Sequence, residues 1–321
     1  MCGCDVGSPS EFNGYAISSV RKEIIPDLLK GYSEDDCVLV YSDSFFHWND
    51  VLLNLKDSEC RLVVCSVGFF GSHGKGHIIE LIKSFGDRCA IICHSDSHPE
   101  CSIIKSYGLR YSVIPNGVSD SEFASEARIE DGSPWQIITI ANCYPGKGHP
   151  QVIAALLDLH RRGKHDFVWT LCCTTPSWPI AKRLTDQICG AIPKFPFKAR
   201  VIRDQPRASV IDALKSSHLM MHGSVSEVAP LVILESMAAG VPWVSFDVGN
   251  VSSLAGGVVC GAPPSAISPN GKILADAADN LLSNRIVASK LSDEGVALIH
   301  DKFSWDKIAL EYESACFPNV G

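Results

Sequence analysis

The sequence lacks both a long apolar run and an excess of positive charge. No stretch of the 321-residue chain approaches the roughly 20 apolar residues of a membrane-spanning helix. Its first residues contain neither the basic nor the apolar region of a signal peptide, so we expect a cytoplasmic protein. The formal net charge is -8. This disfavours a general nucleic-acid-binding function, because proteins that bind nucleic acids do so through broad basic surfaces of their own.

Cysteine patterns typical of a disulfide framework or a zinc site are also lacking. The chain has 14 cysteines, but they are scattered. Many lie in strand-like apolar runs, such as Cys65, Cys93, Cys172 and Cys173. We interpret them as small buried hydrophobic residues in a reducing compartment. Cys2 and Cys4 have no second pair at zinc spacing, which disfavours a metal fragment there.

What the chain does contain is an alternation of strand-like and helix-like segments over most of its length. This alternation predicts an α/β protein, and the length fits two Rossmann-like, doubly wound domains. Because residues 125–134 resemble a linker, we place an N-terminal domain at 1–128 and a C-terminal domain at 129–321. The last helix is a candidate to pack back on the N-terminal domain. No clear strand opens the chain before the helix expected at 18–30, so the N-terminal domain is abbreviated or the chain begins inside it.

Residues 224–250, SVSEVAPLVILESMAAGVPWVSFDVGN, combine a polar loop, a helix and a buried strand. Pro230 fits the first turn of a helix over 231–239, because its missing N–H costs nothing there. Gly240 followed by Pro242 is a stop signal for that helix. The apolar run after it predicts a parallel strand that leads into a functional loop.

Two glutamates bracket the start of this helix. Glu227 precedes the helix and Glu235 lies inside it, so both can face a pocket at its positive end. The alternative is that both are solvated surface acids. Apolar residues surround Glu235 in sequence, however, and a buried carboxylate there requires a hydrogen-bonding partner such as a sugar or ribose hydroxyl.

The segment ANCYPGKGHP at 141–150 joins a strand to a helix and carries a flexible, positively charged turn. Glycine lets the backbone approach an anion, and the helix adds unpaired N–H groups. The candidate phosphate contacts are Asn142, Gly146, Lys147 and Gly148. An ordinary strand-to-helix turn with an exposed lysine is the alternative. Ligands of doubly wound sheets bind beyond the carboxyl ends of the strands, so the loops after Ile140, His222 and Asp247 are expected to converge on one cleft.

Histidine and aspartate alternate just after the strand-like segment RCAII, at His94, Asp96 and His98. A metal site is one interpretation of this spacing, but we expect no metal there, because such spacing in a loop is common. A structural histidine at a strand end and a catalytic histidine are the other two. His73, His77 and His98 compete for any catalytic assignment.

Four segments together resemble retaining glycosyltransferases of family 4, which have the GT-B fold. SVSEVAPLVILESMAAGVP is similar to their E-x7-E signature, and ANCYPGKGHPQVIAAL is similar to their phosphate loop. VIPNGVSDSEF, from residue 113, resembles the motif that closes their N-terminal domain. FSWDKIALEYES, from residue 303, resembles their terminal helix.

The resemblance implies two Rossmann-like domains that face each other across a cleft, with the donor held mainly by the C-terminal domain. Glu227 would then bind the transferred sugar, Glu235 the ribose hydroxyls and Lys147 the diphosphate. The amides of Val228, Ala229 and Leu231 at the positive end of the helix would support the same charge, and Pro230 is a further expected donor-binding residue. His94 is our candidate for the histidine that relatives place in the N-terminal domain. Glu227, Lys147 and His94 are the expected catalytic residues.

The resemblance also implies the reaction. A hexosyltransferase-type enzyme would move a sugar from a nucleoside diphosphate donor to a glycan, lipid-linked or small-molecule acceptor. It would retain the anomeric configuration and need no cofactor and no obligatory metal. Contact with a membrane, if made, would be peripheral.

Three departures from the family pattern keep other functions open. Asn142 stands where the family often has an arginine, and Ser253 where a glutamate is frequent. The N-terminal glycine-rich turn is reduced to Asn13 and Gly14, which we assign to the acceptor side. The alternatives are a sugar-nucleotide epimerase or hydrolase, and a degenerate protein that binds nucleotide sugars without catalysis.

Overall fold

The computed structural model divides the chain into two compact units. Unit 1 comprises residues 1–114 with 310–321, and unit 2 comprises residues 115–309. This boundary differs from the expected one at 128/129, and the domain limits stay a prediction. The residues that the structure describes are 10–12, 15–17, 33–34, 36–41, 52–53, 55–56, 58–66, 76–97, 99–119, 123, 134–265 and 269–317.

Unit 1 is built on a four-stranded parallel sheet. In sheet order its strands are β3 (Cys37–Tyr41), β4 (Arg61–Ser66), β5 (Cys89–Cys93) and β6 (Ser112–Val113). The connections carry α3 (Gly76–Ser84), the 3-10 turn η3 (Gly86–Arg88) and α4 (Pro99–Ser106). The sequence did not predict the antiparallel pair β1 (Ser10–Phe12) and β2 (Tyr15–Ile17). The expected helix at 18–30 lies outside the described residues.

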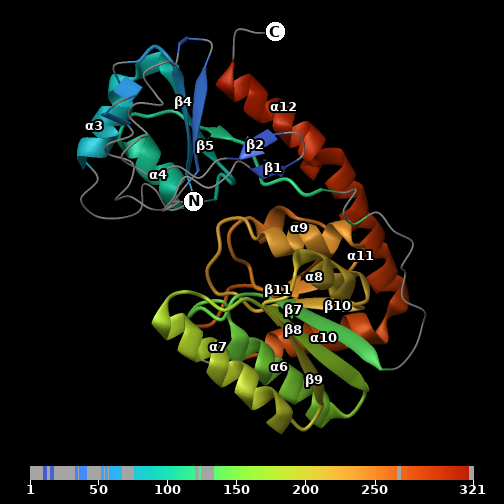
Figure 1. Ribbon diagram of the computed structural model, residues 1–321. Helices are drawn as coiled ribbons and strands as arrows, with labels where there is room; N and C mark the ends of the chain where they lie inside the picture. The colour runs from blue at the N-terminus through green and yellow to red at the C-terminus, as the bar shows by residue number, and fades with distance from the viewer. Residues whose placement is uncertain are drawn as a thin grey trace. The chain divides into compact units, whose positions relative to one another are not determined.

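Unit 2 contains a six-stranded parallel sheet with the order β12-β11-β10-β7-β8-β9. Figure 1 labels β7 to β11 of this sheet. Its strands are β7 (Trp135–Ile140), β8 (Phe167–Cys173), β9 (Lys198–Arg203), β10 (Leu219–His222), β11 (Trp243–Ser245) and β12 (Gly257–Val259). The fully buried Trp169 and Trp243 fill the core around this sheet. Each indole N–H donates a hydrogen bond, to Thr139 Oγ1 and to the Ala255 carbonyl respectively, so neither polar atom is buried unpaired.

Helices lie between strands of unit 2 and also follow its last strand, β12. They are α6 (His149–Arg162), α7 (Pro179–Ala191), α8 (Arg207–Lys215), α9 (Leu231–Ala238), α10 (Lys272–Ser283) and α11 (Arg285–Leu298), with short turns η4 (Ile192–Lys194), η5 (Val251–Ser253) and η6 (Ile299–Phe303). The last helix, α12 (Trp305–Cys316), begins in unit 2 and ends in unit 1. No helix in the described part of the chain is long and apolar enough to cross a bilayer.

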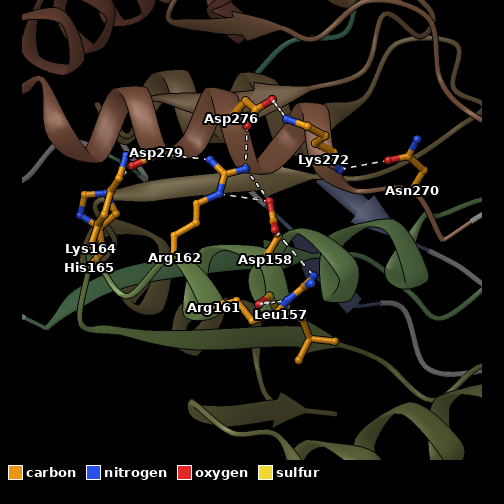
Figure 2. Close-up of polar contacts among 10 residues, drawn as sticks. All are labelled: Leu157, Asp158, Arg161, Arg162, Lys164, His165, Asn270, Lys272, Asp276 and Asp279. Atoms are coloured by element: carbon orange, nitrogen blue, oxygen red, sulfur yellow. Dashed lines mark hydrogen bonds and ion pairs between the residues drawn. The ribbon is translucent and has the colours of Figure 1, made fainter.

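An ion-pair network joins α6 to α10 (Figure 2). The Arg162 guanidinium contacts Asp276 at 2.6 Å and Asp279 at 3.2 Å, and it also contacts Asp158 on its own helix. Asp279 in turn lies 2.8 Å from His165 Nε2. Because several charges share these contacts, the network restrains α6 more than an isolated surface pair would. It thereby fixes the helix that follows the candidate phosphate loop.

Candidate functional site

Two loops meet at the carboxyl edge of the unit 2 sheet, where β7 and β10 are neighbours. The Gly146 carbonyl accepts hydrogen bonds from the Val225 amide at 2.8 Å and from Ser224 Oγ at 3.1 Å. A Cβ atom on Gly148 would lie 1.5 Å from the Gly223 carbonyl oxygen, and the φ of Gly148 is +68°. Only glycine fits this position, because the two backbones touch there and the φ is left-handed. The anion contact expected of Gly148 from the sequence stays a prediction.

The contact between these loops brings Lys147 to Glu227. Lys147 Nζ lies 2.7 Å from Glu227 Oε1, and His222 Nε2 lies 3.4 Å from the same oxygen. The other ring nitrogen of His222, Nδ1, is 2.9 Å from Ser245 Oγ. Ser245, the last residue of β11, therefore orients this histidine. The Glu227 side chain is 12% exposed and the Lys147 side chain 35%. A buried carboxylate and a partly exposed ammonium therefore share the end of the sheet.

These partners decide the protonation state of Glu227. Burial alone raises the pKa of its carboxyl group, but the hydrogen bond from His222 and the charge of Lys147 together lower it to about 2. Glu227 is thus a carboxylate throughout the neutral range. It can accept hydrogen bonds from a ligand but has no proton to donate to one.

The start of α9 lies beside this pair and is held from two sides. Pro230 is the residue before the helix, with an extended conformation. The Asn116 side-chain amide donates to the Ala229 carbonyl at 3.1 Å, and the Asn250 amide donates to the Val228 carbonyl at 3.1 Å. Leu231, the first helical residue, is 45% exposed. The loop after β11 therefore supports the loop after β10 at the positive end of a helix, where an anion is favoured.

Glu235 has a partner that the sequence did not indicate. Arg207, the first residue of α8, places Nη1 2.8 Å from Glu235 Oε1, and the Glu235 side chain is 14% exposed. The expected need of this carboxylate for a hydrogen-bonding group is met in part by Arg207. A ligand hydroxyl at Glu235 would join an existing ion pair.

Comparison with known proteins assigns the family. The family model of the glycosyl transferases group 1 matches residues 120–296, which is more than half of the chain. The chain belongs to this family. By sequence alone, the glycosyltransferase matches no curated protein.

Solved structures place this glycosyltransferase in the GT-B fold. A glycosyltransferase from Rickettsia africae aligns with a TM-score of 0.70 at 16% identity, over 93% of this chain and 81% of its own. Anabaena Alr3699/HepE in complex with UDP and glucose gives 0.70 at 14% identity, over 91% and 80%. Sucrose-phosphate synthase from Thermosynechococcus elongatus gives 0.70 at 16% identity, over 98% and 86%. The expected α/β fold class and the family resemblance are confirmed.

Asn142 braces the candidate phosphate loop of this glycosyltransferase from within. Its Oδ1 accepts hydrogen bonds from the Thr174 amide at 3.0 Å and from Thr174 Oγ1 at 2.6 Å. Its backbone carbonyl lies 3.1 Å from His149 Nε2. The oxygen of this side chain therefore ties the loop after β7 to the loop after β8, and any contact to a ligand falls to the side-chain N–H groups.

His94 lies in unit 1, directly after β5. It is 3% exposed, and its Nδ1 is 3.0 Å from the Ile114 carbonyl. Burial lowers the pKa of this imidazole, and the hydrogen bond to Ile114 offsets part of the effect. Its assignment to the acceptor side stays a prediction. Gly14, His73 and His98 lie outside the described residues, as does the His77 side chain.

The sequence did not predict several other residues of the site. The unpredicted residues are Asn116, Thr174, Arg207, His222 as a Glu227 partner, and Ser245. A signal existed for His222 alone, since it ends a buried strand just before a polar loop. In the part of the chain that the structure describes, no three His, Cys, Asp or Glu side chains gather as metal ligands.

Proposed function

We propose that this glycosyltransferase transfers a sugar from a nucleoside diphosphate donor to an acceptor hydroxyl, with retention of configuration and without an obligatory metal. The observation that carries the proposal is the Lys147–Glu227 pair at 2.7 Å beside the start of α9. It places a positive charge, a hydrogen-bond acceptor and a helix N-terminus within one small region. A nucleoside diphosphate sugar presents complementary groups, namely two phosphates and several hydroxyls.

Lys147 and α9 stabilise the leaving group in this proposal. When the bond to the sugar breaks, negative charge develops on the nucleoside diphosphate, and fixed positive groups lower the barrier. An ammonium group has three N–H donors, so Lys147 can hold Glu227 with one and the diphosphate with the others. Amides near Val228, Ala229 and Leu231 lie at the positive end of α9 and act on the same charge.

Glu227 binds the sugar that is transferred. Because its pKa is about 2, it is ionised at neutral pH and accepts hydrogen bonds from sugar hydroxyls. The same low pKa argues against Glu227 as the proton donor or proton acceptor of the reaction. A donor phosphate oxygen on the same face as the acceptor is then the group that takes the acceptor proton.

Glu235 and Arg207 hold the ribose end of the donor. The carboxylate accepts from the ribose hydroxyls while Arg207 fixes its orientation at 2.8 Å. UDP-glucose is the first donor to test, because Anabaena Alr3699/HepE has been solved with UDP-glucose and shares the fold. The acceptor is a glycan, a lipid-linked sugar or a small molecule, and the assignment of His94 and Gly14 to the acceptor stays a prediction.

The proposal is tested with Glu227→Gln, which keeps the shape of the side chain and removes its charge. Sugar nucleotides are incubated with an acceptor panel, and nucleoside diphosphate release is measured by chromatography. We expect transfer to fall at least about a hundredfold, since a charged hydrogen bond at the reacting sugar is lost, while UDP affinity changes little. Glu294→Gln, which removes an exposed carboxylate on α11, is the matched control. Unchanged transfer in Glu227→Gln would rule out the assigned role.

One observation favours a second candidate, a non-catalytic nucleotide-sugar binder. Asn142 uses its side-chain oxygen to brace Thr174, where the family often has an arginine for the diphosphate. The donor panel separates the possibilities. Donors that bind but are not consumed with any acceptor indicate the binding protein, and donors consumed without acceptor indicate a hydrolase or epimerase.

A further inference from the structure

A cavity of about 360 Å³ lies at the amino-terminal edge of the unit 2 sheet. Trp135, the first residue of β7, and His218, which directly precedes β10, are part of its lining. The candidate donor loops follow the other ends of the same two strands, so the cavity and the donor site lie at opposite edges of the sheet. All of its described lining residues belong to unit 2. The volume falls within the range of small-molecule sites, roughly 300–1,000 Å³.

Much of the cavity lining is apolar and buried. It includes Val241, Leu281 and Ile299, which are 3%, 2% and 1% exposed. The end of α9 and the middle of α11 also contribute to the lining, and the Gly240 carbonyl accepts a hydrogen bond from Ser292 Oγ at 2.6 Å between them. This bond fixes the two helices to each other, so an apolar group that enters the cavity meets a preformed apolar surface.

In the part of the chain that the structure describes, every ionisable side chain that lines the cavity is basic. These side chains are Lys215, His218, Arg285 and His300, and the described lining contains no aspartate or glutamate. The whole chain, in contrast, has a net charge of -8. Helix α11 begins at Arg285, so the positive end of this helix adds to the same local charge. The cavity therefore favours an anion on a protein that is acidic as a whole.

Trp135 orients two of these basic side chains. The Arg285 Cζ atom lies 4.8 Å from the centroid of the Trp135 ring, and the His218 ring meets the indole edge-on at 5.0 Å. A guanidinium held on an aromatic ring presents a planar fork of N–H groups, which matches the oxygens of a carboxylate or a phosphate. His218 Nδ1 accepts a hydrogen bond from the Gln136 amide at 2.8 Å, so Nε2 carries the proton and is a donor.

We propose that this cavity binds a small organic anion with an apolar or aromatic body and a terminal carboxylate or phosphate group. The buried apolar lining contacts the body, and Arg285 and His218 donate hydrogen bonds to the head group. Lys215 adds a second full positive charge. No candidate donor-site residue is among the described residues of the lining, so this site stands or falls independently of the proposed function.

The first experiment measures binding of fluorinated probes to the full chain by fluorine NMR. The probes are para-trifluoromethylbenzoate, para-trifluoromethylphenyl phosphate and the neutral para-trifluoromethylbenzamide. We expect at least one of the two anions to bind at least about tenfold more tightly than the amide, because only an anion gains from the basic side chains. Saturating UDP should leave this binding unchanged, since the two sites lie at opposite edges of the sheet.

Four results of this experiment would overturn the proposal. They are the absence of binding by both anions, equal binding of the amide, displacement of the bound anion by UDP, and equally effective displacement by inorganic phosphate. Displacement by UDP would assign the probe to the donor site. Equal competition by inorganic phosphate would show that the apolar lining contributes nothing to binding.

The second experiment locates the head group with Arg285→Gln. We expect this substitution to weaken binding of the anionic probe about tenfold, the low end for a charged hydrogen bond, because Arg285 is exposed to solvent. Lys290→Gln is the matched control, since it removes one exposed positive charge from the same helix, and Lys290 is not among the residues of the cavity lining. Equal affinities of the two variants would overturn the assignment.

The third experiment fills the cavity with Ala288→Phe. Ala288 lines the cavity from α11, and a phenyl ring there would occupy the space of the apolar body. We expect loss of probe binding, whereas Ala297→Phe, at an exposed position of the same helix outside the lining, should bind normally. Thermal unfolding establishes that both variants are folded. Wild-type binding in a folded Ala288→Phe would show that the probe binds elsewhere.

Discussion

Lys147→Met tests the centre of the candidate site, because methionine keeps the apolar length of the side chain and removes the ammonium group. In the wild type this ammonium lies 2.7 Å from a carboxylate that is 12% exposed. The substitution leaves Glu227 with burial, which raises its pKa, and with His222 as its remaining partner. Both the stability of unit 2 and the affinity for a diphosphate should fall.

The expected loss of stability can be derived from the pKa of Glu227. A shift from 4.5 to about 2, at about 1.36 kcal/mol per unit, corresponds to roughly 3 kcal/mol in favour of the charged form. His222 supplies part of this, and solvent screens the 35% exposed Lys147, so the substitution should destabilise unit 2 by on the order of 1–2 kcal/mol. Loss of a charged hydrogen bond to the diphosphate, about 1.5–3 kcal/mol, weakens UDP binding roughly 10- to 150-fold.

The stabilising effect of Lys147 on the Glu227 carboxylate depends on pH. Because the folded pKa of Glu227 is depressed, its stabilising contribution is present above the unfolded value of 4.5 and is lost as the pH falls through about 2. A protonated Glu227 carries no negative charge for the Lys147 ammonium group to stabilise. The stability difference between wild type and Lys147→Met should therefore narrow as the pH falls below 4.5.

Urea unfolding followed by tryptophan fluorescence measures the stability of unit 2, since every tryptophan except Trp48 lies within residues 115–309. Calorimetry with UDP measures the affinity. Lys272→Met is the matched control, because Lys272 forms an exposed pair with Asp276 at 2.8 Å, and such pairs contribute about 1 kcal/mol or less. Wild-type UDP affinity in Lys147→Met, or a stability loss equal to that of the control, would refute the reasoning.

Four further substitutions probe the rest of the structure. Gly148→Ala should destabilise unit 2 by at least about 2 kcal/mol in thermal unfolding, since its Cβ would meet a backbone oxygen. Gly163→Ala, with φ +65° and open space, should cost only about 1–2 kcal/mol, and equal losses would contradict the steric argument. Glu235→Gln should abolish the preference for UDP over its 2′-deoxy analogue in calorimetry. A retained preference would count against binding of the ribose by Glu235 and would leave the ion pair with Arg207 as the only role of this carboxylate. Burial lowers the pKa of His94, so wild-type thermal stability should fall as the pH drops below 6.5 and His94→Asn should flatten this dependence; parallel pH profiles would count against the burial effect.

Local sequence signals predicted the elements around the site well. The stop at Gly240 and the proline at 230 predicted a helix over 231–239, and the structure has α9 at Leu231–Ala238. Apolar runs predicted β7, β8 and β10 in the same way. These signals succeed because helix caps and strand burial depend on a few neighbouring residues.

Partners across the sheet could not be predicted in this way. Lys147 and Glu227 are 80 residues apart, and Asn142 and Thr174 are 32 apart. They meet because β7 lies between β10 and β8, and a parallel sheet gathers the loops that follow its strands at one edge. Nothing in the local pattern specifies that strand order.

The sequence by itself thus determined the α/β class, the helices and strands of unit 2, and Lys147 and Glu227 as candidates for ligand contact. Their ion pair and the bracing of Glu235 by Arg207 were decided by tertiary structure alone. Glu235 shows the reason most clearly, because its partner Arg207 belongs to a different helix, α8. Only the packing of the elements of unit 2 brings the Arg207 guanidinium to 2.8 Å from the Glu235 carboxylate.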